Sequence, residues 1–109
     1  MSLLQRKCQP CTGGTKALGA EAVSQLSTEV STWKVLDGKF LSKEWTFPDF
    51  AEALAFTNRV GALAEEEGHH PDIWFGWGYA KIKIFTHAIK GLHESDFILA
   101  AKVDKIVSG

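Results

Sequence analysis

The stretch 79–86 alternates apolar and polar side chains over most of its length. On an extended backbone one face would carry Ala80, Ile82 and Ile84, and the other would carry Lys81, Lys83 and Phe85. Because successive side chains of a strand point to opposite faces, this pattern predicts a strand with one buried and one partly exposed face. Such a strand needs neighbouring strands and a covering layer of helices, so the chain is constrained to a sheet covered on one side.

A first hairpin is predicted around Asp37-Gly38, because a type I′ turn needs positive φ at both central positions and this dipeptide tolerates it. The strand before the turn alternates over residues 33–35, and the returning strand runs from about 39 to 47. Lys43 interrupts its apolar face, so burial of that face is expected to be incomplete.

Three segments carry apolar side chains at helical spacing: residues 20–30, 48–67 and 94–107. Pro48 and Asp49 suit a helix start, and Gly68 suits the position after a helix end. In the second segment the stripe expected to cover the sheet comprises Phe50, Ala53, Leu54, Thr57, Val60, Gly61 and Ala64. In the third, the inward residues are expected to be Phe97, Ile98, Ala101 and Ile106.

The order of helix, hairpin, helix, hairpin and helix predicts an α+β two-layer fold, a four-stranded antiparallel sheet with about three helices packed on one face. The 109 residues suit one domain, residues 19–109, preceded by a flexible N-terminal arm, residues 1–18. A formal net charge of −1 gives no general attraction to nucleic acid or to an anionic membrane. We see neither a membrane span nor a secretory signal, so a cytoplasmic protein is expected.

The two cysteines, Cys8 and Cys11, lie in this arm. Structural zinc normally needs four ligands, and no second cysteine pair completes such a site. We interpret them as reduced thiols, with metal or redox roles as the alternatives.

Three of the four histidines suggest a site for acid–base catalysis. His69 and His70 precede Pro71, and His87 follows seventeen residues after His70. Imidazole gives and takes protons near neutral pH, which suits acid–base catalysis. A second hairpin, with its turn at Gly78, would bring the end of the 79–86 strand, and hence His87, beside the histidine pair. We therefore predict one site.

Adjacent side chains on extended backbone diverge, and proline keeps His70 extended, so only one of the two histidines can face a given point. Asp96 could instead be a first-turn carboxylate favoured by the helix dipole, and Glu65 a solvated charge. Three carboxylates, residues 65–67, at the negative end of a helix are unfavourable, which suggests that one has a function. His93 is interpreted as an ordinary polar residue. A zinc site is the rival, although the His-Glu-x-x-His spacing of many metallohydrolases is absent.

At these positions the sequence resembles the pterin-4a-carbinolamine dehydratases, the family that includes the dimerization cofactor of a hepatocyte homeodomain transcription factor. The resemblance rests on Glu65-x-x-x-His69-His70-Pro71, Trp77, Thr86-His87, Gly91-Leu92, Asp96 and Leu99-Ala100, and more weakly on Trp45, Phe47, Asp49-Phe50 and Ala53. It covers about residues 20 to 107. His93 stands where the family usually has a serine or threonine that caps the last helix, and such a cap is expected to be poorer.

The resemblance implies a hydro-lyase that converts 4a-hydroxytetrahydropterin to quinonoid dihydropterin and water, in the recycling of tetrahydrobiopterin, without metal or other cofactor. By position, His69 and His87 would be the acid and base, His70 would bind the pterin and assist, and Asp96 would orient a histidine. The pterin would also be bound by Glu65, Pro71, Trp77, Thr86, Ala88 and Ile89.

The family also implies a homodimer or homotetramer, with no nucleic-acid or membrane partner. The alternative on the same fold is a non-enzymatic protein-binding or dimerization cofactor, since fold does not settle function. A metal-dependent hydrolase is the third possibility.

Overall fold

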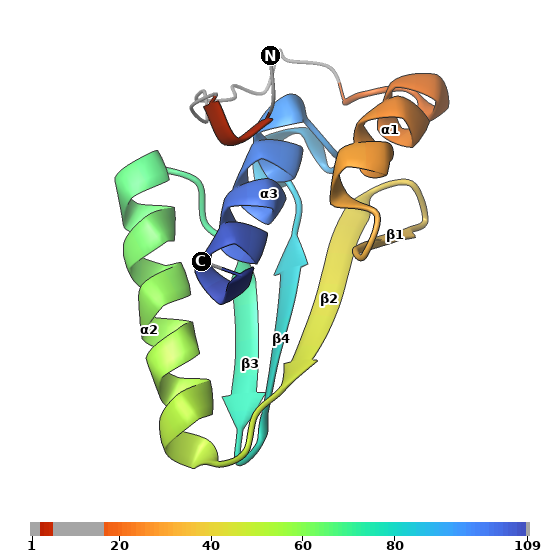
Figure 1. Ribbon diagram of the computed structural model, residues 1–109. Coiled ribbons are helices and arrows are strands. Elements are labelled where there is room, and N and C mark those ends of the chain that lie inside the picture. Colours follow the sequence, from red (N-terminus) through yellow and green to blue (C-terminus); the bar gives the residue numbers. More distant parts are fainter. Residues whose placement is uncertain (1–2, 6–16, 109) are drawn as a thin grey trace.

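The computed structural model describes residues 3–5 and 17–108 of the chain. Four antiparallel strands form a single sheet in the order β1-β2-β4-β3. The strands are β1 (Lys34–Leu36), β2 (Phe40–Thr46), β3 (Asp72–Gly76) and β4 (Tyr79–Ile84). Helices α1 (Ala20–Ser27), α2 (Phe50–Glu67) and α3 (Glu94–Ser108) lie over one face of the sheet (Figure 1). The predicted α+β two-layer fold is confirmed.

Strand β4 is central and follows the predicted alternation. Ala80, Ile82 and Ile84 are fully buried, whereas Lys81 is exposed. These three side chains pack with residues of all three helices in one core, which also contains Val23, Val30, Trp33, Leu41, Phe56, Val60, Leu92, Phe97, Leu99 and Val103. The apolar face of β4 therefore packs against the helices in the core, as the alternation predicted.

The first hairpin has the predicted positive φ angles, 55° at Asp37 and 65° at Gly38. Its loop is one residue longer than a two-residue hairpin, because the register pairs Leu36 with Phe40 and leaves Lys39 in the turn. Lys43, the charge on the apolar face of β2, binds Asp104 of α3 at 2.8 Å and the Thr32 hydroxyl at 2.6 Å. The ion pair with α3 explains how a lysine is tolerated there.

Helix α2 is bounded as predicted, but its buried face differs from the predicted stripe. Asp49 caps the N-terminus by accepting a hydrogen bond from the Glu52 N–H at 2.8 Å, and Gly68 ends the helix with φ of 66°. The buried residues are Ala53, Phe56, Val60, Ala64 and Glu67. Phe50 and Leu54, expected to be inside, are 44% and 38% exposed. The predicted stripe left out Phe56 and Glu67, which are both buried, so the face that α2 turns to the core is rotated from the predicted one.

Helix α3 is buried more completely than its sequence predicted, because it lies among α1, α2 and the sheet. Phe97 and Ile98 are inward as expected, but Ala101 and Ile106 are only partly buried. Residues 95–100 are all buried, which gives a helix start with no exposed face.

The N-terminal arm is only partly described. Leu3 is 2% exposed and belongs to the core, and the Leu18 N–H donates to the Leu92 carbonyl at 2.8 Å. Cys8 and Cys11 lie outside the described residues, so the interpretation of these thiols stays a prediction.

Candidate active site

Asp96 is the centre of the site. It lies in the first turn of α3 and is fully buried. Its Oδ1 lies 2.5 Å from His69 Nε2, and its Oδ2 accepts hydrogen bonds from the Thr86 hydroxyl and the His93 N–H, each at 2.8 Å. The three contacts replace the hydrogen bonds to water that a carboxylate loses when it is buried.

His69 reaches Asp96 because of the backbone on either side of it. Gly68 turns the chain out of α2 in the left-handed conformation, and the His69 N–H donates to the Ala64 carbonyl at 3.2 Å. The β3–β4 register ends with the pair Asp72 and Lys83, and beyond it His69 and Thr86 lie close enough for both to contact Asp96. The hairpin argument is thereby confirmed for His69 and Thr86.

His70 takes a different direction from His69, as expected for neighbours on extended backbone. Its Nε2 is hydrogen-bonded to Glu65 Oε2, and both side chains are well exposed, at 60% and 78%. Glu65 therefore has a histidine partner, while Glu67 is buried and binds Lys102 of α3 at 2.7 Å. Two of the three carboxylates at the end of α2 thus have contacts that offset their unfavourable position.

His87 begins a 3-10 turn, His87–Ile89, which ends at Lys90 with φ of 51°. A bridge between Thr86 and Gly91 closes this loop against the buried site. The His87 ring is exposed and lies 4.1 Å, centroid to centroid, from the Phe85 ring. His87 is therefore adjacent in sequence to Thr86, but within the described residues it makes no hydrogen bond to the Asp96 cluster.

Of the next two residues, Ala88 is exposed and Ile89 is partly buried, and Pro71, which directly precedes β3, is also partly buried. That these three residues bind a pterin stays a prediction.

Trp77 does not belong to the cluster. It lies in the turn between β3 and β4 and is 72% exposed. His69 precedes β3, whose five residues at about 3.3 Å each separate it from that turn. Sequence comparison alone suggested that Trp77 binds substrate, but the hairpin carries it to the opposite end of the sheet.

His93, interpreted from the sequence as an ordinary polar residue and a poorer cap, makes hydrogen bonds at the start of α3. It caps α3: its ring Nδ1 accepts a hydrogen bond from the Ser95 N–H at 3.1 Å, while its own N–H donates to Asp96. This reciprocal arrangement resembles a capping box, except that the ring of the N-cap residue accepts from the N–H of the second helical residue and not the third. The signal was present in the spacing, because a carboxylate follows three residues after His93.

The geometry assigns the proton-bearing nitrogen of His69. Its Nε2 faces the Asp96 carboxylate, which only accepts, so the ring donates from Nε2, and in its neutral form it keeps Nδ1 as the acceptor nitrogen. Within residues 3–5 and 17–108, no group of three or more histidine, cysteine, aspartate and glutamate side chains is arranged to hold a metal ion.

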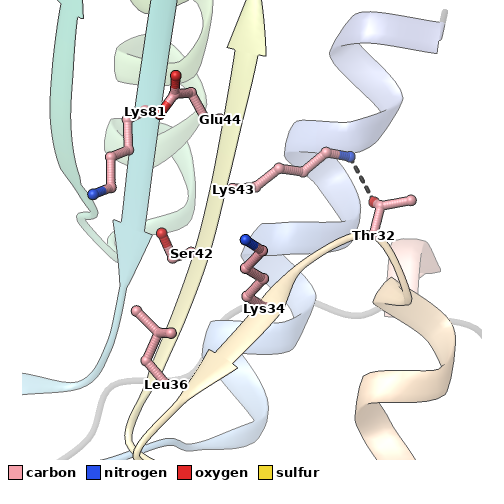
Figure 2. A pocket seen from close by; sticks show the side chains of 7 residues that line it. All are labelled: Thr32, Lys34, Leu36, Ser42, Lys43, Glu44 and Lys81. Atoms are coloured by element: carbon pink, nitrogen blue, oxygen red, sulfur yellow. Dashed lines mark hydrogen bonds between the residues drawn. The ribbon is translucent and has the colours of Figure 1, made fainter.

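A cavity of about 420 Å³ lies elsewhere, against β1, β2 and β4. Figure 2 shows its lining side chains, which include Lys34, Lys43, Lys81 and Glu44 but no histidine. It therefore offers no imidazole for proton transfer at neutral pH, and we place the candidate site at Asp96 and His69.

Comparison with known proteins identifies relatives of the chain. A sequence model of the family described as pterin 4 alpha carbinolamine dehydratase matches residues 16–106. A Rubrobacter xylanophilus protein named "Putative pterin-4-alpha-carbinolamine dehydratase" is 51% identical over 104 residues, covering 95% of this chain and 97% of its own. A protein of the same name from Alkaliphilus metalliredigens is 48% identical, with 95% of each chain covered.

Two solved structures have similar folds. A "transcriptional coactivator/pterin dehydratase" from Brucella melitensis has a TM-score of 0.77 at 24% identity, covering 84% of this chain and 98% of its own. A "pterin dehydratase-like protein", described as a RuBisCO assembly factor of the alpha-carboxysome, has a TM-score of 0.59 at 31% identity, covering 69% of this chain and 91% of its own. Within the described residues, no helix is both long and apolar enough to cross a membrane.

Proposed function

Because the chain belongs to the pterin 4 alpha carbinolamine dehydratase family, we propose that it removes water from 4a-hydroxytetrahydropterin to give quinonoid dihydropterin. The observation that carries the proposal is the pairing of His69 with the buried Asp96 carboxylate. This pairing fixes the orientation and tautomer of one imidazole, as a proton-transfer catalyst requires.

The reaction breaks the bond between ring carbon 4a and its hydroxyl oxygen, and removes the proton from ring nitrogen N5. The electron pair of the N–H bond becomes the second bond between N5 and carbon 4a, and the hydroxyl leaves as water after it is protonated. One acid and one base therefore suffice. In our proposal these are His69, through Nδ1, and His87 from the loop after β4.

The other groups bind and orient. Asp96 holds the His69 ring, and Thr86 holds Asp96. His70 and Glu65, joined by their hydrogen bond at the surface, assist in binding the pterin. The backbone of residues 69–71 and 86–89 supplies donors and acceptors for the flat, hydrogen-bonding ring, with Pro71, Ala88 and Ile89 beside it. We propose that the pterin thus lies between the two histidine-bearing segments, and that the reaction serves tetrahydrobiopterin recycling.

The alternative function is protein binding on the same fold. Large apolar side chains are exposed at Phe50 and Leu54 on α2 and at Trp74, Trp77 and Tyr79 on the β3–β4 hairpin. Exposed apolar groups are used in protein contacts, and they equally suit the homodimer or homotetramer that the family implies. A related solved protein is described as an assembly factor.

The test is the rate of dihydropterin formation from freshly generated 4a-hydroxytetrahydropterin, with EDTA present. The unmodified protein should accelerate the reaction, and His69→Ala and His87→Ala should each reduce the rate by on the order of 10²-fold. Lys34→Ala, an exposed change on β1, is the matched control and should leave the rate unchanged.

No acceleration over the spontaneous reaction would reject the dehydratase and leave the binding function. Loss of the rate with EDTA would support the metal-dependent alternative.

A further inference from the structure

The first turn of α3 is closed on itself by three hydrogen bonds between residues 93 and 96. The His93 ring Nδ1 accepts from the Ser95 N–H at 3.1 Å, and the His93 N–H donates to Asp96 Oδ2 at 2.8 Å. The Asp96 N–H donates back to the His93 carbonyl at 3.0 Å. His93 therefore contacts the helix through its ring, its N–H and its carbonyl.

These contacts determine where the Asp96 carboxylate points. Its Oδ2 is held by two donors on different segments, the His93 N–H and the Thr86 hydroxyl. With Oδ2 fixed, the remaining oxygen, Oδ1, is aimed at His69 Nε2. The orientation of the His69 ring therefore depends on the helix cap, because the Asp96 carboxylate contacts both.

We propose that His93 is a positioning residue for His69, and that it acts through the helix cap and Asp96 rather than by touching substrate. The proposal rests on the dehydratase function proposed above. It also gives the site a sensitivity to acid, because a ring Nδ1 that accepts a hydrogen bond loses its acceptor lone pair when it is protonated. A serine or threonine at the same position would cap without this dependence.

The titratable and charged groups around this cap come from several segments. Asp96 contacts His93 directly, and Glu94 follows it in the same turn. His69, from the segment before β3, shares the Asp96 carboxylate, and Lys90 lies three residues earlier in the loop after β4. Protonation of either His69 or His93 could therefore change the activity. A variant that lacks only the His93 ring is needed to separate the two effects.

The experiment compares the unmodified protein with His93→Ala, which removes the cap acceptor, and His93→Ser, which restores a cap that does not titrate. Dehydration kinetics are measured at about pH 7.5 and about pH 5.5, on either side of the range where imidazoles titrate. We expect His93→Ala to lower kcat by roughly 3- to 10-fold with little change in KM, because the bound geometry of the catalytic ring is relaxed. His93→Ser should recover most of this loss.

The pH comparison distinguishes positioning from simple stability. On going to the lower pH, the unmodified protein should lose more activity than His93→Ser, while the loss through His69 is common to both. Equal kcat for His93→Ala and the unmodified protein, a change confined to KM, or identical pH profiles for the unmodified protein and His93→Ser would each overturn the proposal.

A second readout does not depend on turnover. The ¹⁵N shifts of the His69 ring should show one tautomer, with hydrogen on Nε2, in the unmodified protein and in His93→Ser, and a mixture in His93→Ala. If the protein does not accelerate dehydration but the tautomers follow this pattern, the proposed function fails and the positioning stands. An unchanged His69 tautomer in His93→Ala would overturn the positioning whatever the activity.

Discussion

Asp96 Oδ1 lies 2.5 Å from His69 Nε2, although 27 residues separate the two in the chain. Asp96 is fully buried in the first turn of α3, and the His69 side chain, between α2 and β3, is only 13% exposed. The contact joins the start of α3 to the segment that leads into β3. It therefore couples the stability of the α3 cap to the orientation of the imidazole that we propose as a catalyst.

Asp96→Asn tests this coupling. The amide keeps the size of the side chain but removes the charge that holds hydrogen on His69 Nε2, so the ring can adopt the wrong tautomer. We expect kcat for 4a-hydroxytetrahydropterin dehydration to fall by at least about 10-fold, with a smaller change in KM. Unchanged kcat in a folded variant would show that Asp96 is only a first-turn carboxylate.

Thr86→Val and Thr86→Ser form a matched pair. Valine keeps the shape but removes the hydroxyl that donates to Asp96 at 2.8 Å, while serine keeps it, and both retain the backbone bond to Gly91. Valine should lower the free energy of unfolding by about 1–2 kcal/mol, measured by urea denaturation, because it leaves a buried acceptor short of a donor. Serine should retain clearly more stability and activity than valine, and the reverse order would contradict the hydrogen-bond argument.

Gly68→Ala and Gly61→Ala should change stability in opposite directions. Neither added methyl group would meet another atom within 4 Å, but Gly68 has φ of 66° whereas Gly61 lies inside helix α2. We expect Gly68→Ala to cost about 1 kcal/mol and Gly61→Ala to gain about 0.5–1 kcal/mol in thermal or urea unfolding. Since Gly68 precedes His69, only the former should also reduce activity.

Lys102→Met should destabilise the protein by about 1.5–3 kcal/mol, because it removes the ammonium group that lies 2.7 Å from the Glu67 carboxylate, whose side chain is only 5% exposed. Lys105→Met is the control: Lys105 is exposed on the same helix, and the change should stay within about 0.5 kcal/mol. Urea denaturation of the two variants measures the difference, and equal values would show that the ion pair between α2 and α3 contributes little.

Glu65→Gln tests whether Glu65 supports pterin binding or is only a solvated surface charge. The Glu65–His70 pair is well exposed, so its loss should change the free energy of unfolding by less than about 0.5 kcal/mol. If Glu65 supports pterin binding through His70, KM should still rise severalfold. Unchanged KM and stability together would leave Glu65 as surface charge.

The local elements were predictable because each depends on neighbours in sequence. The alternation of residues 80–84 and the positive-φ pair Asp37-Gly38 follow from the chemistry of a few consecutive residues, as do the Asp49 and Gly68 helix ends. The meeting of His69 with Thr86 also followed, since a hairpin fixes which residues lie opposite one another. The site could be assembled this far from periodicity and turn chemistry alone.

Other features depended on how whole elements pack. Periodicity gave α2 an apolar stripe but not its rotation, which buries Phe56 and Glu67 and exposes Phe50 and Leu54. Trp77 was grouped with the histidines by resemblance, yet the length of β3 places it at the other end of the hairpin. Neither result can be read from a single segment, because each depends on how far and in what direction other elements extend.

The α+β order of elements, the two ends of α2 and the convergence of His69 with Thr86 could be inferred from the sequence, because these follow from local backbone preferences and strand pairing. The burial of Asp96, its contact with His69 and the capping of α3 by His93 came from the packing of the whole chain. The physical reason is that the first turn of α3 packs against the sheet and the segment before β3. Its orphan N–H groups and its carboxylate must then find their partners within the protein instead of in water.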